Sequence, residues 1–263
     1  MKDIRFFQVD AFTSTPFRGN PAAICLLDDE LSVDLMQSIA AENNLAETAF
    51  VLRRGEGFNL RWFTPTVEID LCGHATLATA HILWEQKILS KTEKARFFTR
   101  SGELSATRSG AWIELDFPTV QPHPAKLPAP LQEALGVDPI RVAYAKDRYL
   151  IELATEQEVR ALVPDFGKLR EMDISVVTSL AADPLPFDFI SRTFASSHGI
   201  DEDPVTGSSH CSLVPYYAEK LNKHEFTAYQ ASPRGGELRL KLNHDRVLIS
   251  GQAVTIIEGT MRL

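Results

Sequence analysis

A helix-sized apolar segment occurs twice in this chain, each time at the same distance from a second short motif. Gly73 begins "GHATLATAHIL", and 29 residues later Gly102 begins "GELSATRSGAWIEL". Gly207 begins "GSSHCSLVPYY", and again 29 residues later Gly236 begins "GELRLKLNHDRVLI". Self-similarity at a constant offset is typical of a duplicated structural unit. The sequence therefore predicts two pseudo-symmetric halves, each with one central helix.

Both helical segments have the composition of buried helices. The first contains no Asp, Glu, Lys or Arg, and a helix that is apolar on every face has to be buried on every face. Its small residues Ala75, Ala78 and Ala80 let neighbouring backbone approach closely. The second helix is similar, although Pro215 is expected to kink or loosen one turn. We expect each helix to be surrounded by a barrel-like sheet.

The remaining segments indicate an α+β class. Strand patterns occur in "IRFFQVDAF", "AAICLL", "TAFVLRR", "FNLRWFT", "ARFFTRSGEL" and "AWIELDF". Another helix is predicted in "LSVDLMQSIAAEN", with Ser32 as N-cap and Val33, Met36, Ile39 and Ala40 at helical spacing. Residues 118–130 hold five prolines and predict a linker or crossing segment, which places the first half at 1–118.

Composition excludes several function classes. A net charge of −8 argues against a general nucleic-acid or acidic-membrane binder, while an anionic small substrate stays possible. The cysteines Cys25, Cys72 and Cys211 are odd in number and form no CxxC pair, as is typical of reduced intracellular thiols. No signal peptide and no 18-residue apolar run is visible. We expect a cytoplasmic protein.

The two glycine-led helix starts are candidate anion sites. Helix N-termini carry partial positive charge and unsatisfied N–H groups. Gly73 with His74, and Gly207 with Ser208, lie at such starts. If the two halves face each other, both starts converge on one cleft that suits a carboxylated substrate. The alternative is two ordinary capped helices.

Two carboxyl groups are candidate acid/base residues. Asp203 precedes Pro204, which favours an extended backbone and places the carboxylate beside the following helix start. Its neighbours Asp201 and Glu202 are expected to be solvated acids. Glu47 lies where the polar loop "ENN" meets an apolar strand, so its carboxyl is a candidate for partial burial and proton transfer. The alternative is an exposed glutamate at a strand start.

The histidines and cysteines leave the chemistry open. His74 can donate or accept a proton near neutral pH, whereas His81 is expected in the core or bound to a partner. No HxH, HxxxH or HExxH spacing occurs, so a metal site is not predicted. Cys72 is a possible nucleophile if a base and an oxyanion hole accompany it.

The motifs "QVDAFTSTPFRGNPAA", "NNLAETAF", "FTPTVEIDLCGHATLA", "DEDPVTGSSH" and "SPRGGEL" occur in one order between residue 8 and about residue 238. In these motifs the chain resembles the PhzF-like family, named for the isomerase of phenazine biosynthesis. The resemblance implies a diaminopimelate-epimerase-like fold with the site between two similar halves. It also implies that residues 252–263 return to complete the first half, which leaves 119–251 as the second half. Homodimers without metal or organic cofactor are expected.

The resemblance also implies roles for individual residues. Glu47 matches the proton-transferring glutamate, and His74 and Asp203 match groups that polarise or orient the substrate. Gly73, Gly207 and Ser208 match positions that hold its carboxylate. Diaminopimelate epimerases use two facing cysteines instead, which Cys72 and Cys211 do not reproduce around the two glycines.

The expected function is a cofactor-independent isomerase that moves a proton or double bond on a small carboxylated substrate by general acid/base catalysis. One alternative is a protein-interaction partner with vestigial catalysis. A second alternative is a thiol-dependent epimerase. The identity of the substrate does not follow from the sequence.

Overall fold

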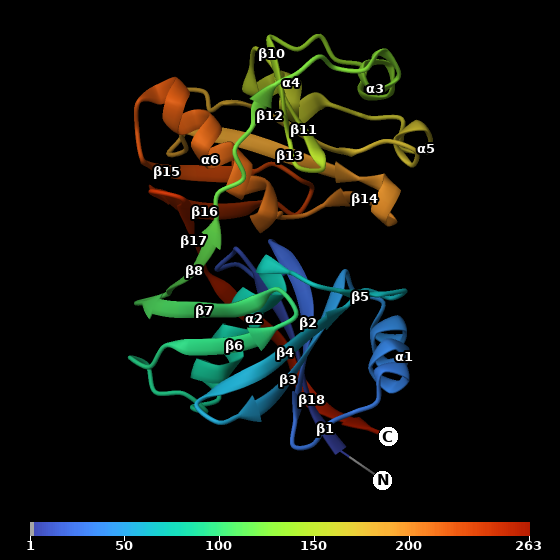
Figure 1. The fold of residues 1–263 in the computed structure, drawn as a ribbon, viewed down its shortest axis with the longest axis vertical. Coiled ribbons are helices and arrows are strands. Elements are labelled where there is room, and N and C mark those ends of the chain that lie inside the picture. The colour runs from blue at the N-terminus through green and yellow to red at the C-terminus, as the bar shows by residue number, and fades with distance from the viewer. Residues whose placement is uncertain (1–2) are drawn as a thin grey trace. The chain divides into compact units, whose positions relative to one another are not determined.

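The computed structural model describes residues 3–263, which form two compact units (Figure 1). Unit 1 comprises the residues up to Asp116 together with Ser250–Leu263, and unit 2 comprises Phe117–Ile249. The boundaries between the units lie after residues 116 and 249, whereas the sequence-based boundaries lie after residues 118 and 251.

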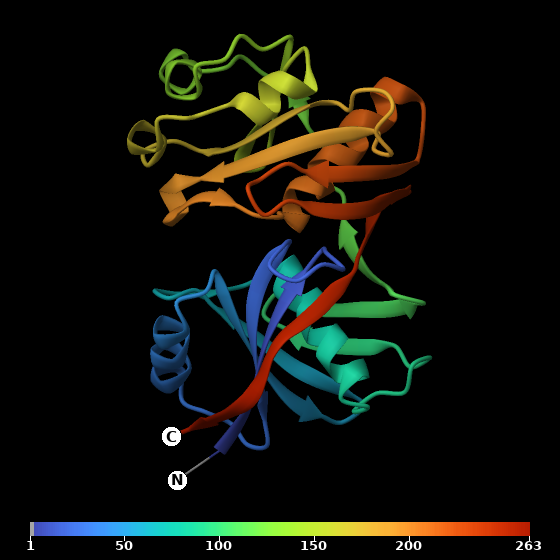
Figure 2. The same cartoon turned by 180° about the vertical axis from the view of Figure 1, so that it is seen from behind.

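Unit 1 is a mixed sheet in which β18 and β1 lie side by side along their whole length (Figure 2). β1 is antiparallel to β18 and β2, β2 is parallel to β3, and β3 is antiparallel to β4. β4 is antiparallel to β5 and parallel to β6, and β6–β7–β8 follow antiparallel. The strands are β1 (Asp3–Ala11), β2 (Asn20–Leu27), β3 (Glu47–Arg54), β4 (Gly57–Phe63), β5 (Glu68–Ile69), β6 (Ala95–Thr99), β7 (Gly102–Ser109), β8 (Trp112–Pro118) and β18 (Ala253–Arg262).

Unit 2 repeats these pairings. β10 is antiparallel to β9 and β11, β11 is parallel to β12, and β12 is antiparallel to β13. β13 is antiparallel to β14 and parallel to β15, which is antiparallel to β16. The strands are β9 (His123–Pro124), β10 (Arg141–Ala145), β11 (Arg148–Glu152), β12 (Ile174–Leu180), β13 (Phe189–Ala195), β14 (Ile200–Asp203), β15 (Glu225–Gln230), β16 (Gly236–Asn243) and β17 (Arg246–Gly251).

The duplicated motif of the sequence marks equivalent elements of the two units. Helix α2 begins at Gly73 and helix α6 at Gly207, while strands β7 and β16 begin at Gly102 and Gly236. Each "GEL" follows a turn and starts the second strand of an antiparallel hairpin. The order of parallel and antiparallel partners is the same in both units, so the repeat in sequence is a repeat in topology.

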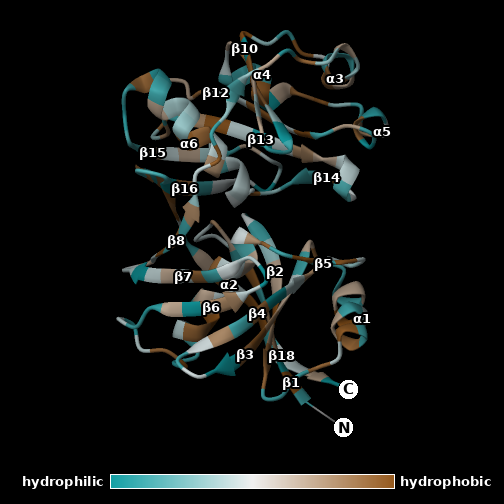
Figure 3. Cartoon of the chain, viewed as in Figure 1, coloured by the Kyte–Doolittle hydropathy of each residue, from teal (hydrophilic) through white to brown (hydrophobic). Residues whose placement is uncertain are grey.

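Helix α2 (Gly73–Glu85) forms the core of unit 1 because its sides are apolar. Residues 74–80 and 82–84 are all buried, and the helix packs on β1, β2, β3 and β18. His81 is the partly buried exception, and its Nε2 lies 3.1 Å from Oγ1 of Thr255 on β18. Strands β2 and β3 are buried over most of their length. Along β8 hydrophilic and hydrophobic residues alternate (Figure 3), and the hydrophobic Ile113, Leu115 and Phe117 are buried. Such alternation turns one face of a strand towards the core.

Helix α6 (Gly207–Leu221) contains Pro215 and continues through it. A proline inside a helix leaves the carbonyl four residues earlier without its N–H donor. Here that carbonyl belongs to Cys211, and it accepts a hydrogen bond of 3.0 Å from the backbone N–H of Val120. The proline-rich segment therefore satisfies the group that Pro215 leaves open.

The other helices are short and peripheral. In α1 (Val33–Asn43) the hydroxyl of Ser32 caps the helix at Leu35 N, as predicted. Met36, Ile39 and Ala40 are buried, whereas Val33 is exposed in the first turn. Among the described residues, no helix is both long and apolar enough to cross a membrane. The remaining helices are α3 (Ala129–Leu135), α4 (Glu156–Ala161), α5 (Phe166–Leu169) and the 3-10 turn η1 (Ser196–His198).

Candidate active site

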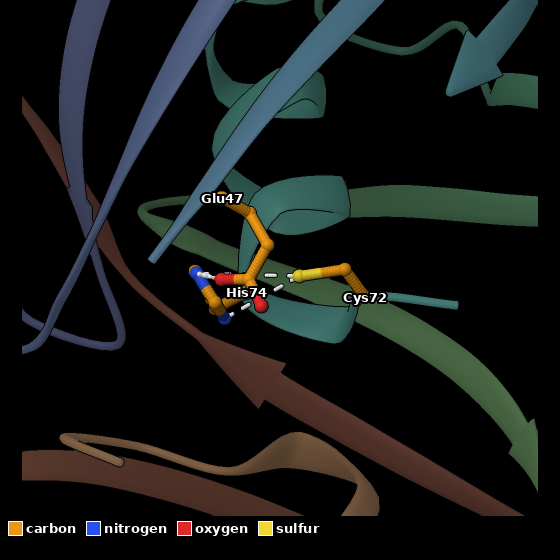
Figure 4. A group of neighbouring side chains, drawn as sticks. All are labelled: Glu47, Cys72 and His74. Atoms are coloured by element: carbon orange, nitrogen blue, oxygen red, sulfur yellow. Dashed lines mark hydrogen bonds and ion pairs between the residues drawn. The ribbon is translucent and has the colours of Figure 1, made fainter. Parts of the chain in front are cut away.

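A carboxylate and an imidazole meet at the start of α2 (Figure 4). Glu47 is the first residue of β3 and His74 is the second residue of α2. Glu47 Oε2 lies 2.9 Å from His74 Nε2, and the two residues are only 8% and 5% exposed. Glu47 is thus a buried group and not the exposed strand-start glutamate considered above.

Two further groups surround the other nitrogen of His74. Cys72 Sγ lies 3.5 Å from His74 Nδ1, and Asn20 Nδ2 lies 3.2 Å from the same atom. Asn20 is the first residue of β2, and β2 pairs with β3 so that Ala22 faces Glu47. Neighbouring parallel strands therefore bring Asn20 and Glu47 to the same end of the helix.

This environment changes the proton affinities of His74 and Cys72. Burial lowers the pKa of His74, but the neighbouring Cys72 and Glu47 raise it more, so that the net pKa is well above the ordinary value. Burial, together with the charge of Glu47, raises the pKa of the Cys72 thiol. Negative charge on the neighbours of His74 therefore favours the protonated form of its ring.

The start of α2 has no side-chain cap. Cys72 is the N-cap residue, in extended conformation, and its side chain makes no capping hydrogen bond. Gly73 follows as the first helical residue. The leading N–H groups of a helix without such a cap can bind an anion, such as a substrate carboxylate.

Unit 2 has a corresponding group at the start of α6. Thr206 is the N-cap and also makes no capping hydrogen bond, and Gly207 and Ser208 follow. Arg148 Nη1 donates to the hydroxyl of Ser208 at 3.0 Å and to that of Ser209 at 3.1 Å. A guanidinium at this helix start adds positive charge to the partial charge of the helix.

Asp203 lies at the end of β14 and binds this same helix start. Its Oδ2 accepts a hydrogen bond of 2.5 Å from the hydroxyl of Thr206. The side chain of Gln230 holds the loop from both sides, because Nε2 donates to Asp203 O at 2.7 Å and Oε1 accepts from Thr206 N at 2.8 Å. The Asp-Pro segment is thereby fixed against α6.

The expectation that Glu202 is a solvated acid is wrong. Its side chain is 11% exposed and forms a two-bond ion pair with Arg192, with N–O distances of 2.7 and 2.8 Å. Arg192 also donates to backbone carbonyls, including that of Leu162 at 2.7 Å. Glu202 lies on β14, which pairs with β13, so the strand pairing brings the two charges together. Asp201 is exposed, as expected.

The structure thus brings the six candidate residues into two groups, one in each unit. Glu47, Gly73 and His74 lie together in unit 1, and Asp203, Gly207 and Ser208 lie together in unit 2. The sequence analysis did not predict Asn20 or Arg148 as residues of the site. Asn20 and Arg148 open the equivalent strands β2 and β11, but they stand 53 and 59 residues before Gly73 and Gly207, so no constant spacing indicates them.

The comparisons with known proteins agree on one family. The sequence profile of the phenazine biosynthesis-like proteins, PhzC-PhzF, matches residues 9–259. A protein of Halalkalibacterium halodurans, called an uncharacterized isomerase, is 49% identical to this chain and is covered over 98% of both lengths. The crystal structure of a PhzF family protein from Enterococcus faecalis is 39% identical, with a TM-score of 0.95 over 100% of both chains.

More distant likeness identifies the fold alone. A Pseudomonas aeruginosa protein described as a predicted epimerase is 22% identical, with a TM-score of 0.74 over 98% of this chain and 99% of the other. These likenesses and the repeated topology confirm the predicted α+β, diaminopimelate-epimerase-like fold with two similar halves.

Proposed function

The chain belongs to the phenazine biosynthesis-like family, and from this membership and the Glu47–His74 contact we propose that it is a cofactor-independent isomerase. The proposed reaction moves a proton, or a double bond with it, on a small carboxylated substrate. Relatives that are called isomerases support the reaction class. The contact supports the assignment of the acid/base residues.

Glu47 is the proposed proton carrier. Its carboxylate removes a proton from an activated carbon of the substrate and returns it at the same or another carbon. His74, protonated beside it, can donate a hydrogen bond to the oxygen on which negative charge develops. This proton transfer requires only that the carboxylate and the imidazolium are held in position and have matched proton affinities.

The two helix starts are the proposed carboxylate-binding groups. Neither Cys72 nor Thr206 caps its helix, which leaves the N–H groups at Gly73 and at Gly207 and Ser208 for a substrate carboxylate. Asp203 is proposed to orient the substrate or assist the transfer. Its hydrogen bond with Thr206 keeps it beside the second helix start.

The single observation that carries this proposal is the buried contact of 2.9 Å between Glu47 and His74. The test is to incubate the protein in D₂O with a panel of small carboxylic acids that carry a proton on a carbon next to a carbonyl or double bond. Proton NMR follows deuterium incorporation. We expect Glu47→Gln to slow exchange of an accepted acid by roughly 10²–10⁴-fold.

The matched control is Glu42→Gln, which neutralises an exposed glutamate of the same unit. It should exchange at the wild-type rate, and circular dichroism should show all three proteins folded. Exchange at an undiminished rate in folded Glu47→Gln would refute the assignment of Glu47.

A thiol-dependent epimerase is the second candidate, because Cys72 Sγ lies 3.5 Å from His74 Nδ1. A reaction with two thiols needs a second cysteine at the equivalent position before α6, where Thr206 stands. The Cys72→Ser variant decides between the candidates. Loss of exchange in Cys72→Ser with retention in Glu47→Gln supports the thiol, and the opposite result supports the carboxylate.

A further inference from the structure

The loop between β1 and β2 carries an aromatic side chain that the proposed chemistry does not use. Phe17 is 72% exposed and is the one phenylalanine among the exposed large hydrophobic residues of the described part of the chain. Its φ of +67° lies in the left-handed region, where a bulky residue is an outlier. Phe12 in the same loop also has a positive φ, but it is fully buried, and its packing accounts for the conformation. Phe17 therefore combines an unfavourable backbone conformation with an exposed apolar ring.

Neighbouring groups hold Phe17 in this conformation. Its backbone N–H donates to Oδ2 of Asp10 at 2.8 Å, and Asp10 is only 1% exposed. Gly19 follows with a φ of +64°, and a Cβ at this position would lie 2.1 Å from the carbonyl oxygen of Ala11. The loop therefore closes tightly on the end of β1. Strained residues persist where the surrounding contacts enforce them, and they cluster at binding and catalytic sites.

The loop leaves the sheet at the edge where the candidate acid/base residues lie. β1 ends at Ala11, β2 begins at Asn20, and the parallel strand β3 begins at Glu47. The side chain of Asn20 contacts His74. Phe17 precedes Asn20 by three residues, so their Cα atoms are at most about 11 Å apart. A phenyl ring on this loop is thus within reach of a ligand bound beside His74.

A second exposed apolar side chain lies at the same edge. Leu71 is 40% exposed and immediately precedes Cys72, the N-cap of α2. Single exposed hydrophobic residues are common on protein surfaces and need no explanation. Phe17 and Leu71 differ because both flank one buried polar site, and ligand sites combine a few polar groups with an apolar and aromatic lining. This arrangement suits a ligand with a charged end at the helix start and an apolar part beside the loop.

We propose that Phe17, together with Leu71, binds an apolar part of the substrate and so selects carboxylic acids that carry an apolar group. This inference rests on the proposed function, because it places the substrate carboxylate at the start of α2. Phe17 is a specificity-determining residue and takes no part in the proton transfer. Contact between aromatic groups adds to the burial of apolar area, so loss of the ring should cost an aromatic acid roughly 2–10-fold in affinity.

Ligand-observed NMR tests this contact without any need for turnover. Phenylacetate and acetate are titrated with the full chain, and saturation-transfer measurements give the two dissociation constants. We expect the wild type to prefer phenylacetate, with saturation transferred most strongly to its ring protons. Phe17→Asn should lose roughly 2–10-fold of that preference. Phe17→Tyr keeps an aromatic ring and should keep the preference.

Stability measurements separate this role from a structural one. Asparagine adopts a positive φ more readily than phenylalanine, so Phe17→Asn should unfold at the same temperature as wild type or at a higher one. Lys87→Gly is the matched control, since Lys87 is exposed, has a φ of +57° and follows the opposite end of α2. It should stabilise the protein and leave the preference for phenylacetate unchanged.

Either of two results would overturn the proposal. One is equal affinity of the wild type for phenylacetate and acetate, and the other is the same preference in Phe17→Asn as in wild type. Failure of the proposed reaction is detected separately, because D₂O exchange measures turnover and the titration measures binding. Glu47→Gln should lose exchange but keep the preference for phenylacetate.

Discussion

Arg148 donates a hydrogen bond from Nη1 to the hydroxyl of Ser208 at 3.0 Å. The contact has a counterpart in the other unit, where the amide of Asn20 lies 3.2 Å from His74. Asn20 and Arg148 open equivalent strands, and His74 and Ser208 are the second residues of equivalent helices. The duplication has therefore kept a polar contact between strand and helix while its residue types diverged from amide and imidazole to guanidinium and hydroxyl.

Replacing Arg148 with methionine should destabilise the protein and weaken anion binding. The variant removes hydrogen bonds to Ser208 and to buried Ser209, and leaves Asp147 without its ion pair. Lost hydrogen bonds of this kind cost about 1–3 kcal/mol. Urea unfolding measures the cost. Asp147 is half-exposed, so Asp147→Asn is the control and should cost less than about 1 kcal/mol.

The repeat could be predicted because a helix and a hairpin keep their spacing along the chain. The contacts among the candidate site residues of each unit could not be predicted in the same way. Glu47 contacts His74 because α2 packs on β3, and no sequence spacing encodes such a contact. The same holds for Arg148 and Ser208, which are 60 residues apart.

The misjudged Glu202 shows a different limit. Three acids before a proline resemble a solvated turn, and only the pairing of β14 with β13 brings Arg192 within ion-pair distance of Glu202. The residue type of Glu202 indicates its charge but does not indicate which residue forms an ion pair with it. Burial of an acid depends on whether a counter-charge is folded against it, which is a property of the tertiary structure.

Glu202→Gln should therefore be strongly destabilising. The change leaves Arg192, which is 7% exposed, with a buried charge and no carboxylate in the pair. Breaking a buried pair from one side costs roughly 3–5 kcal/mol. Chemical denaturation of the variant measures this. The adjacent control Asp201→Asn alters an exposed acid and should stay within about 0.5 kcal/mol of wild type. Equal stability of the two variants would contradict the buried pair.

The native thiols should be slow to react with Ellman's reagent. Cys25, Cys72 and Cys211 are all free and buried, and burial raises the pKa of Cys25 and of Cys211 to about 12. The thiolate is the reactive form, and it is scarce at pH 8 under these conditions. We expect three titratable thiols in denaturant and a much slower reaction in its absence. Fast labelling of the native protein at Cys25 or Cys211 would show that these positions open to solvent.

His210 should make the protein less stable as the pH falls from about 6.5 to about 4. Burial in α6 lowers its pKa from 6.5 to about 4 and outweighs the hydrogen bond of 2.9 Å from Nδ1 to Thr206 O, which by itself raises the pKa. Nε2 has no hydrogen-bond partner among residues 3–263. Below pH 6.5 the unfolded chain binds a proton at His210, whereas the folded chain binds it only near pH 4. The stability due to neutral His210 is therefore fully present above pH 6.5. It is lost towards pH 4, by about 3 kcal/mol in total.

The test compares His210→Asn with wild type in urea unfolding at several pH values. The variant should lose the part of the pH dependence of the unfolding free energy that is due to His210. Identical pH profiles would refute the lowered pKa, and a variant that is less stable by the same amount at every pH would show that the ring acts only through packing.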